Sequence, residues 1–279
     1  MKSIPRLFPA AAALLVLAGP VRAATLPATE ADAAAGRELV KRYADAIVSI
    51  EMVVVVKTGG DRGSQSREVK RDANGTMISP TGLTVTSLAL IDPRAGGNTG
   101  GRGGGDAPET EFKEVKLRLA DNSEIPARVV LKDADLDLAF IAPESEAAAA
   151  GHTFSCVKLD DPAEAKVLGT YFEITRLPKT MQRVPIVQAS SVLGVIEKPR
   201  RFILVSEQTL GCPVFDPQGR VLGLAFVYSS GGRQVGVVLL PAADLADAAK
   251  QAAAVKLDPP EKPAEETKAA EEAKAPAAP

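Results

Sequence analysis

The sequence predicts an all-β protein in two parts, with a short helix near each end. Short segments rich in valine, isoleucine and threonine alternate with turn residues along most of the chain. The length of 279 residues, 46% of them hydrophobic, is sufficient for one two-part domain or for two small domains. Helical patterns of apolar residues lie near the ends, at residues 32–47 and 242–254. These observations together favour many short strands over a helical or mixed fold.

The first 23 residues have the pattern of a secretory signal peptide. Lys2 and Arg6 precede an apolar run at residues 10–18, and small residues precede a cleavage point after Ala23. The apolar run is too short to span a bilayer, and no later segment is long and apolar enough to do so. We therefore expect export to the periplasm or the extracellular space, with no membrane span after cleavage.

Charge and composition limit the possible partners. Removal of residues 1–23 takes away three positive charges, so the net charge moves from −2 to −5. The mature chain has no basic stripe, which argues against a nucleic acid as partner. Residues 255–279 consist almost entirely of proline, alanine, glutamate and lysine, so we expect this tail to be disordered.

After the signal peptide, residues 24–47 are expected to form a leader and a helix. Apolar residues recur at helical spacing over residues 39–47. Asp32 is the expected N-cap, because an aspartate side chain can accept a hydrogen bond from a free backbone N–H at a helix start. This helix precedes the first segment with a strong β pattern.

The strand patterns fall into two groups, separated by an alanine- and glutamate-rich connection at residues 142–151. Those of the first group lie at residues 48–57, 67–71, 75–86 (with a tight turn at 79–82), 115–119 and 124–131. Those of the second lie at residues 166–175, 184–197, 201–205, 221–228 and 234–240. The glycine-rich residues 91–110 show no periodicity and predict a mobile surface loop, with partner binding as the alternative.

Three sequence motifs occur in a fixed order. Residues 75–91 read Gly-Thr-Met-Ile-Ser-Pro-Thr-Gly-Leu-Thr-Val-Thr-Ser-Leu-Ala-Leu-Ile, residues 132–141 read Lys-Asp-Ala-Asp-Leu-Asp-Leu-Ala-Phe-Ile, and residues 209–224 read Thr-Leu-Gly-Cys-Pro-Val-Phe-Asp-Pro-Gln-Gly-Arg-Val-Leu-Gly-Leu. Together they resemble the trypsin-like serine proteases of the Deg/HtrA kind. The resemblance implies two β-barrels, one over residues 48–145 and one, with a closing helix, over residues 146–254.

The resemblance also implies where the catalytic triad of the family falls in this chain. It places the general base on Ala89, the acidic member on Asp137 and the nucleophile on Leu210. Alanine cannot exchange a proton, and leucine has no lone pair with which to attack a carbonyl. Because both the base and the nucleophile are missing, we expect no serine protease activity. With no histidine to orient, Asp137 is expected to accept hydrogen bonds from loop N–H groups in a structural role.

The loop around the nucleophile position departs from the family pattern in length as well. This loop contains Thr209, Leu210, Gly211 and Cys212. Residues just before Leu210 are deleted relative to the family. An oxyanion hole needs the N–H groups of this loop to converge on one point. A shorter loop is expected to direct them elsewhere.

Three alternatives remain open at this stage. Cys212 could act as a nucleophile, although it lies two residues late and no base is placed beside it. A serine such as Ser206 could act if the alignment is wrong, but a histidine would still be missing. The chain could also be a purely structural module. His152, the only histidine, follows the connection between the halves and is expected to be a surface or linker residue.

No metal or cofactor is expected. One histidine cannot form a metal site without cysteine or carboxylate partners at ligand spacing, and the glycines of residues 91–110 do not form a phosphate-binding motif. Cys156 and Cys212 could pair in an exported protein, or they could be two small buried hydrophobic residues. The expected partner is an unknown peptide or another envelope protein, and the sequence leaves the oligomeric state open.

Overall fold

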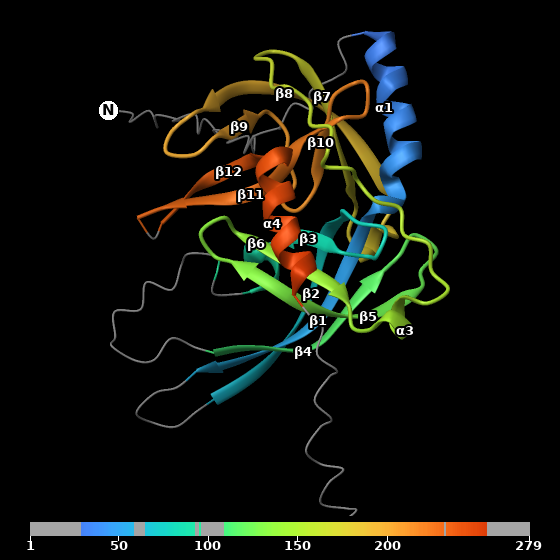
Figure 1. Ribbon diagram of the computed structural model, residues 1–279, viewed down its shortest axis with the longest axis vertical. Coiled ribbons are helices and arrows are strands. Elements are labelled where there is room, and N and C mark those ends of the chain that lie inside the picture. The colour runs from blue at the N-terminus through green and yellow to red at the C-terminus, as the bar shows by residue number, and fades with distance from the viewer. Residues whose placement is uncertain (1–28, 59–64, 93–94, 96–108, 232, 256–279) are drawn as a thin grey trace, which may run out of the picture.

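The computed structural model describes residues 29–58, 65–92, 95, 109–231 and 233–255. Most of these residues form two closed barrels of six strands each, shown one above the other in Figure 1. The predicted all-β fold of two barrels is thereby confirmed. The predicted signal peptide and most of the 91–110 and 255–279 segments lie outside the described residues, so those expectations stay predictions.

The first barrel joins its strands in the order β1-β2-β3-β6-β5-β4. Its strands are β1 (Ile47–Thr58), β2 (Gln65–Met77), β3 (Thr84–Ser87), β4 (Glu109–Arg118), β5 (Glu124–Asp133) and β6 (Leu138–Pro143). Two four-residue helices, α2 (Leu88–Ile91) and α3 (Glu146–Ala149), follow β3 and β6. The interior is filled by inward-facing aliphatic side chains that include Ile50, Val54, Met77, Leu117, Ile125 and Ile141.

The second barrel joins its strands in the order β10-β11-β12-β9-β8-β7. Its strands are β7 (Thr170–Arg176), β8 (Pro185–Ile196), β9 (Phe202–Val205), β10 (Pro213–Phe215), β11 (Val221–Ser230) and β12 (Arg233–Pro241). The strand predicted to start at Lys166 starts at Thr170 instead. A turn precedes it, in which the N–H of Gly169 donates to the carbonyl of Lys166 at 2.8 Å.

The N-terminal helix differs from its prediction at both ends. Helix α1 spans Glu30–Tyr43 and continues as a single 3₁₀ turn, η1 (Ala44–Ala46), before β1. The expected N-cap was wrong, because Thr29 caps the helix and its Oγ1 accepts the N–H of Asp32 at 3.1 Å. Asp32 lies in the first turn, where a negative charge interacts favourably with the helix dipole.

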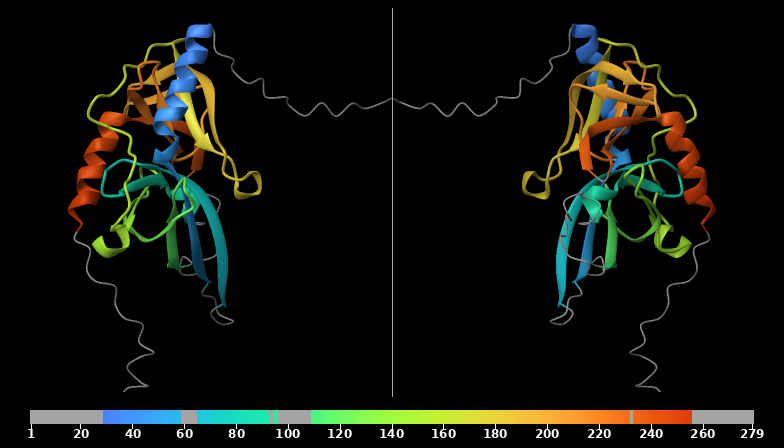
Figure 2. Two further views of the ribbon diagram at one scale, coloured as in Figure 1. Left: turned by 90° about the vertical axis from the view of Figure 1, so that its right-hand side faces the viewer. Right: turned by 90° about the vertical axis from the view of Figure 1, so that its left-hand side faces the viewer.

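A core shared by the two barrels holds them together. It contains Leu83 and Phe140 of the first barrel, Phe226 of the second, and Leu245 of helix α4 (Ala242–Ala254). The bounds of α4 are those predicted from the sequence, and Figure 2 shows this helix along one side of the molecule, reaching from the second barrel to the first. A shared apolar core of this kind favours one fixed arrangement of the barrels.

Polar contacts add to this junction on the side of β1. The loop between β7 and β8 includes the 3₁₀ turn η2 (Lys179–Met181) and contains Arg183 near its end. The guanidinium of Arg183 donates to Ser49 at 3.0 Å and to Asp72 at 2.8 Å, and it also binds Glu51. The loop of the second barrel is therefore tied to β1 and β2 of the first.

Candidate functional site

Asp137 lies at the junction of the two barrels, in the turn before β6. Its side chain is 6% exposed. Its Oδ1 accepts the N–H of Ala89 at 2.7 Å, and its Oδ2 accepts the N–H of Val227 at 2.8 Å. The hydroxyl of Ser87 donates to the same Oδ2. One carboxylate thus connects β6, the start of α2 and β11.

Burial and hydrogen bonding act in opposite directions on this carboxyl group. Burial raises the pKa of Asp137, and the hydrogen bonds from Ser87, Val227 and Ala89 oppose that rise. Such bonds to an ionised carboxylate are stronger than those between neutral groups. The arrangement is that of a structural anchor, because the donors Ser87, Ala89 and Val227 belong to three different elements, β3, α2 and β11.

Ala89 is in direct contact with Asp137 through its backbone alone. It is the second residue of α2, and its N–H makes the 2.7 Å bond to the carboxylate. Its side chain is a methyl group, which can neither take nor give a proton. His152 does not take this place, because its ring lies beside that of Phe154 with the centroids 6.3 Å apart.

The loop at residues 206–212 connects β9 to β10 and contains Leu210. Its first two residues are bonded to β8: the N–H of Ser206 donates to the carbonyl of Ser191 at 3.0 Å, and the N–H of Glu207 donates to the hydroxyl of Ser190 at 3.2 Å. The same hydroxyl donates back to the carbonyl of Glu207 at 3.0 Å. These bonds hold the loop against the end of the second barrel.

Three further backbone N–H groups of this loop, closer to the nucleophile position, also have partners inside the protein. The N–H of Thr209 donates to the carboxylate of Glu173. The N–H of Gly211 donates to the carbonyl of Ala225 at 2.8 Å, and that of Cys212 donates to the carbonyl of Thr209 at 3.0 Å. These groups therefore point to three different acceptors and do not converge on one point.

Glu173 was not singled out from the sequence. It lies on β7 with no exposed surface, and Gln188 of β8 donates to its second oxygen at 3.4 Å. The sequence did contain a signal for this residue, since Glu173 interrupts the apolar run Tyr171–Phe172–Glu173–Ile174. A carboxylate buried in such a strand requires a specific partner. Besides Gln188, its carboxylate accepts the backbone N–H of Thr209, one residue before Leu210.

Gly211 fixes the loop against the first barrel. It has a φ of +75°, and a Cβ atom there would lie 2.8 Å from both the carbonyl oxygen of Asn74 and the Oγ1 of Thr86. The hydroxyl of Thr76 donates to the carbonyl of Gly211 at 2.7 Å. The structure thus places Leu210 next to a residue that packs on β2 and β3, at the same junction as Ala89 and Asp137.

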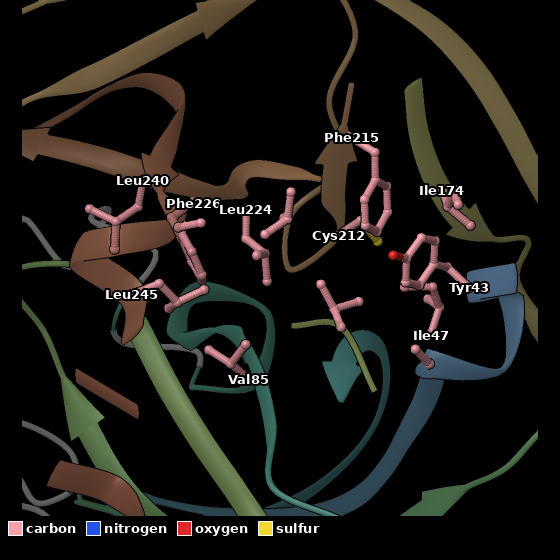
Figure 3. Close-up of a cluster of buried hydrophobic side chains, with 14 of the residues drawn as sticks. Tyr43, Ile47, Val85, Ile174, Cys212, Phe215, Leu224, Phe226, Leu240 and Leu245 are labelled. Atoms are coloured by element: carbon pink, nitrogen blue, oxygen red, sulfur yellow. The ribbon is translucent and has the colours of Figure 1, made fainter. Parts of the chain in front are cut away.

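Cys212 belongs to the shared core. It has no exposed surface, and Figure 3 shows it beside Phe215, with Tyr43 and Ile174 close by. Its Sγ donates to the Oγ1 of Thr175 at 3.2 Å. Burial, followed by the negative charge of Glu173, raises the pKa of the Cys212 thiol well above its ordinary value. A thiol in this state is a poor source of thiolate.

The two cysteines do not form the disulfide that the sequence left open. Cys156 and Cys212 are both free. Cys156 packs against the interior of the first barrel, and Cys212 lies in the shared core. Burial raises the pKa of the Cys156 thiol as well. The alternative, two small buried hydrophobic residues, holds for Cys212, whereas Cys156 is only partly buried.

One strand at the junction has an open edge. The ladder between β10 and β11 ends at Leu224, and the loop extends it to Ala225 through Gly211 and Cys212. On the same edge the N–H of Val227 goes to Asp137. Residues 227–230 pair with β12 on their other edge. On this edge no strand of the described part of the chain pairs with them, and the N–H of Val227 is bonded to the Asp137 side chain.

The described residues contain no group of three or more histidine, cysteine or acidic side chains that could hold a metal ion. Among the helices of the same residues, none is long and apolar enough to cross a membrane. The candidate site consists of the strand edge of β11, the buried carboxylate of Asp137 and the hydrogen-bonded loop at residues 206–212.

Comparison with known protein families identifies the type of domain. A family profile described as a trypsin-like peptidase domain matches residues 73–224, which is more than half of the chain. The matched segment starts in β2 and ends in β11, so it includes Ala89, Asp137, Glu173 and the 206–212 loop, whereas the open edge at residues 227–230 lies beyond it. No curated protein is significantly similar to the chain.

Proposed function

Since this chain belongs to the family of trypsin-like peptidase domains, we propose that it is an exported pseudoprotease. In this proposal the chain has lost peptide-bond hydrolysis and acts in the cell envelope by binding an extended segment of a peptide or of another protein. The observation that carries the proposal is the open edge of β11 at residues 227–230. This edge lies next to the three triad positions, two of which lack the general base and the nucleophile.

The loss of catalysis is supported by three features of the site. Ala89 has no proton to exchange, and Leu210 has no nucleophilic atom. The N–H groups of Thr209, Gly211 and Cys212 are bonded to other groups of the chain, so they would have to break those bonds before they could stabilise an oxyanion. Triad members act as a unit, and the loss of one removes most of the rate acceleration.

The binding role is supported by the unpaired backbone of β11. Successive residues of a strand direct their N–H and C=O groups to alternate edges. Ala225 and Val227 face the open edge, so Ser229 faces it too. An exposed strand edge can add an extended peptide through main-chain hydrogen bonds, with alternate side chains providing specificity. The occupant that fits is therefore an extended chain with alternating inward and outward side chains.

The alternative of a residual peptidase has no geometric support at either candidate nucleophile. Cys212 is fully buried with its thiol bonded to Thr175. The hydroxyl of Ser206 accepts the N–H of Ser191 at 3.0 Å. His152, the one histidine of the chain, lies beside Phe154.

Peptidase activity on unfolded casein tests the loss of catalysis. The purified protein and its Cys212→Ala variant are both expected to leave casein intact. Cleavage by the parent that disappears in Cys212→Ala would establish a cysteine peptidase and overturn the proposal. Cleavage by both proteins that persists through further purification would overturn it in favour of a different nucleophile.

Strand addition is tested with peptides selected from a random display library. Each selected peptide is remade with N-methyl groups on its odd-numbered amides and, separately, on its even-numbered amides. Because only alternate amides of an added strand face β11, one set is expected to abolish binding and the other to preserve it. Equal binding by both sets, or no selected peptide, contradicts the proposal.

A protein variant provides the matched test. Ser229→Pro removes one outward N–H and leaves the bonds between β11 and β12 in place, since that N–H faces away from β12. We expect an affinity loss on the order of fivefold to tenfold, as for one main-chain hydrogen bond of about 1 kcal/mol. Ser229→Ala keeps the N–H and is expected to bind like the parent.

A further inference from the structure

An apolar groove lies between the first barrel and the end of α4. Its volume is about 510 Å³, and none of the three triad positions lines it. Figure 2 shows the end of α4 beside α3, whose residues form one side of the groove. The apolar part of the lining consists of Leu83, Val130, Pro143, Phe154, Ala252 and Val255. The described residues thus leave this apolar surface uncovered.

The walls of this groove are built by close packing. Gly82 has a φ of +86°, and a Cβ atom there would lie 2.9 Å from the Cγ of Pro143 and 3.3 Å from the Cε2 of Phe154. The N–H of Leu83, the next residue, donates to the hydroxyl of Ser79 at 3.1 Å. The turn at residues 79–82 is therefore fixed against the lining, and a ligand meets a groove that is already formed.

The chain leaves α4 from the wall of the groove itself. Val255 follows the last residue of α4 with an extended backbone, at a φ of −66° and a ψ of 111°. It lines the groove and is 39% exposed. Leu257 is the only large apolar residue from position 256 to the end of the sequence. Because two extended residues span about 7 Å, Leu257 is within reach of the apolar lining.

The residues around Leu257 favour an extended segment that costs little to order. Pro259 and Pro260 follow it after Asp258, so φ is fixed at both prolines and the residue before them is restricted to extended conformations. A segment already restricted in this way loses less conformational entropy on binding. Glu146 is the one charged residue of the lining, and its charge is opposite to that of Lys256.

We propose that this groove is the docking site of the chain's own residues 256–260, with the side chain of Leu257 inserted against Leu83 and Phe154. The segment is attached at the groove wall, so its effective concentration is on the order of millimolar, which favours it over a free peptide or a second copy. The expectation of disorder then applies to residues 261–279. This inference is independent of the proposed binding at the edge of β11.

His152 provides a probe of the groove. It lines the groove and is the only histidine of the chain, so its imidazole gives a single Hε1 signal in a proton NMR spectrum of the untagged protein. Leu257→Ser is expected to shift this signal and to lower the melting temperature by about 2–4 °C, as for the loss of one partly buried side chain. Ala264→Ser, further along the tail, is the control and should leave both values unchanged.

A double-mutant comparison tests whether Leu257 acts through this groove. Ala253 lines the groove near the end of α4, whereas Ala254, also exposed, does not line it. Ala253→Glu places a charge in the groove, so adding Leu257→Ser to it should cause little further change in melting temperature. In an Ala254→Glu background, Leu257→Ser should keep its full effect, because the groove stays open to the leucine.

A synthetic peptide of residues 255–262 tests the contact directly. Added at millimolar concentration to the Leu257→Ser protein, it is expected to return the His152 signal towards its parental position, and the same peptide with serine for leucine is not. The same His152 signal in the parent and Leu257→Ser would overturn the proposal, and so would a failure of the peptide. A parental signal that changes on dilution would identify a second copy as the occupant and also overturn it.

Discussion

The carboxylate of Asp137, at the end of a turn in the first barrel, accepts the backbone N–H of Val227 in the second barrel at 2.8 Å. The same side chain accepts the N–H of Ala89 at 2.7 Å. One buried carboxylate is therefore bonded to two residues that lie 48 and 90 positions away from it in the sequence. The acidic position of the site thus has a structural function that does not require a histidine.

Replacement of Asp137 is expected to destabilise the protein. Asp137→Ala leaves the N–H groups of Ala89 and Val227 without an acceptor, at a cost of about 1–3 kcal/mol. The melting temperature and the urea midpoint measure this loss. Asp135→Ala, at an exposed position of the same turn, is the control and is expected to have little effect. Equal stability of Asp137→Ala and Asp135→Ala would contradict the structural role.

Gly211 is expected to tolerate no side chain. Gly211→Ala places a Cβ 2.8 Å from the carbonyl oxygen of Asn74, at a φ of +75° that disfavours alanine. We expect a loss of about 2 kcal/mol or more in the free energy of unfolding. Gly231 is the matched control, since it also has a positive φ, of +59°, but open space around it. Gly231→Ala should therefore lower the free energy of unfolding only through the strain of alanine at a positive φ, by about 1 kcal/mol. A smaller loss for Gly211→Ala than for Gly231→Ala would show that the loop does not pack on the first barrel in this way.

Glu51 is expected to make part of the stability depend on pH. The hydrogen bond from Arg118 holds the pKa of Glu51 below its ordinary value, with the charge of Arg183 acting in the same direction. Because the pKa is lower in the folded state, the stabilisation is present above the unfolded value of about 4.3 and is lost as the pH falls through the folded value. Glu51→Gln should lower the free energy of unfolding at pH 7 by about 1 kcal/mol, in the range of one ordinary hydrogen bond, since the glutamine side chain can still accept from Arg118.

Urea unfolding of the parent and Glu51→Gln between pH 3 and pH 7 tests this pH dependence. The difference between the two proteins should shrink as the pH falls below about 4. Glu38→Gln removes an exposed ion pair with Lys41 and should have little effect at any pH. A constant difference between parent and Glu51→Gln across this range would rule out ionisation of Glu51 as its cause.

Both cysteines are expected to be reduced. Denatured protein that has not been treated with a reductant should contain two free thiols per chain, because Cys156 and Cys212 are unpaired. In the native protein Cys212 should not react with a thiol reagent, since it has no exposed surface and burial raises its pKa. In a Cys156→Ser variant only Cys212 can react, so labelling of this variant reports on Cys212 alone. No free thiol in denatured monomeric protein would establish a disulfide, and rapid native labelling of Cys156→Ser would show that Cys212 is accessible.

Local pattern was sufficient for most of the secondary structure. The apolar alternation around Val115 and Leu117 predicts a half-buried strand, and β4 contains both residues buried. The pattern over Ala242–Ala254 predicts α4 with its observed bounds. Helix boundaries were less predictable where neighbouring residues compete for the same capping position. Thr29 and Asp32 are both good N-caps, and only the backbone geometry shows that Thr29 takes that role.

The sequence resemblance alone places Ala89, Asp137 and Leu210 at the three triad positions. It also implies that the base position and the nucleophile position lack the residues that catalysis needs. The roles of Glu173 and of the edge of β11 required the folded structure. Each depends on atoms far apart in the chain: Glu173 meets Thr209, and Val227 on β11 meets Asp137. Periodicity reports which face of a strand is buried, because side-chain direction is a local property of the backbone. It contains no information on which strand pairs with which, so the open edge at residues 227–230 appears only when both barrels have closed.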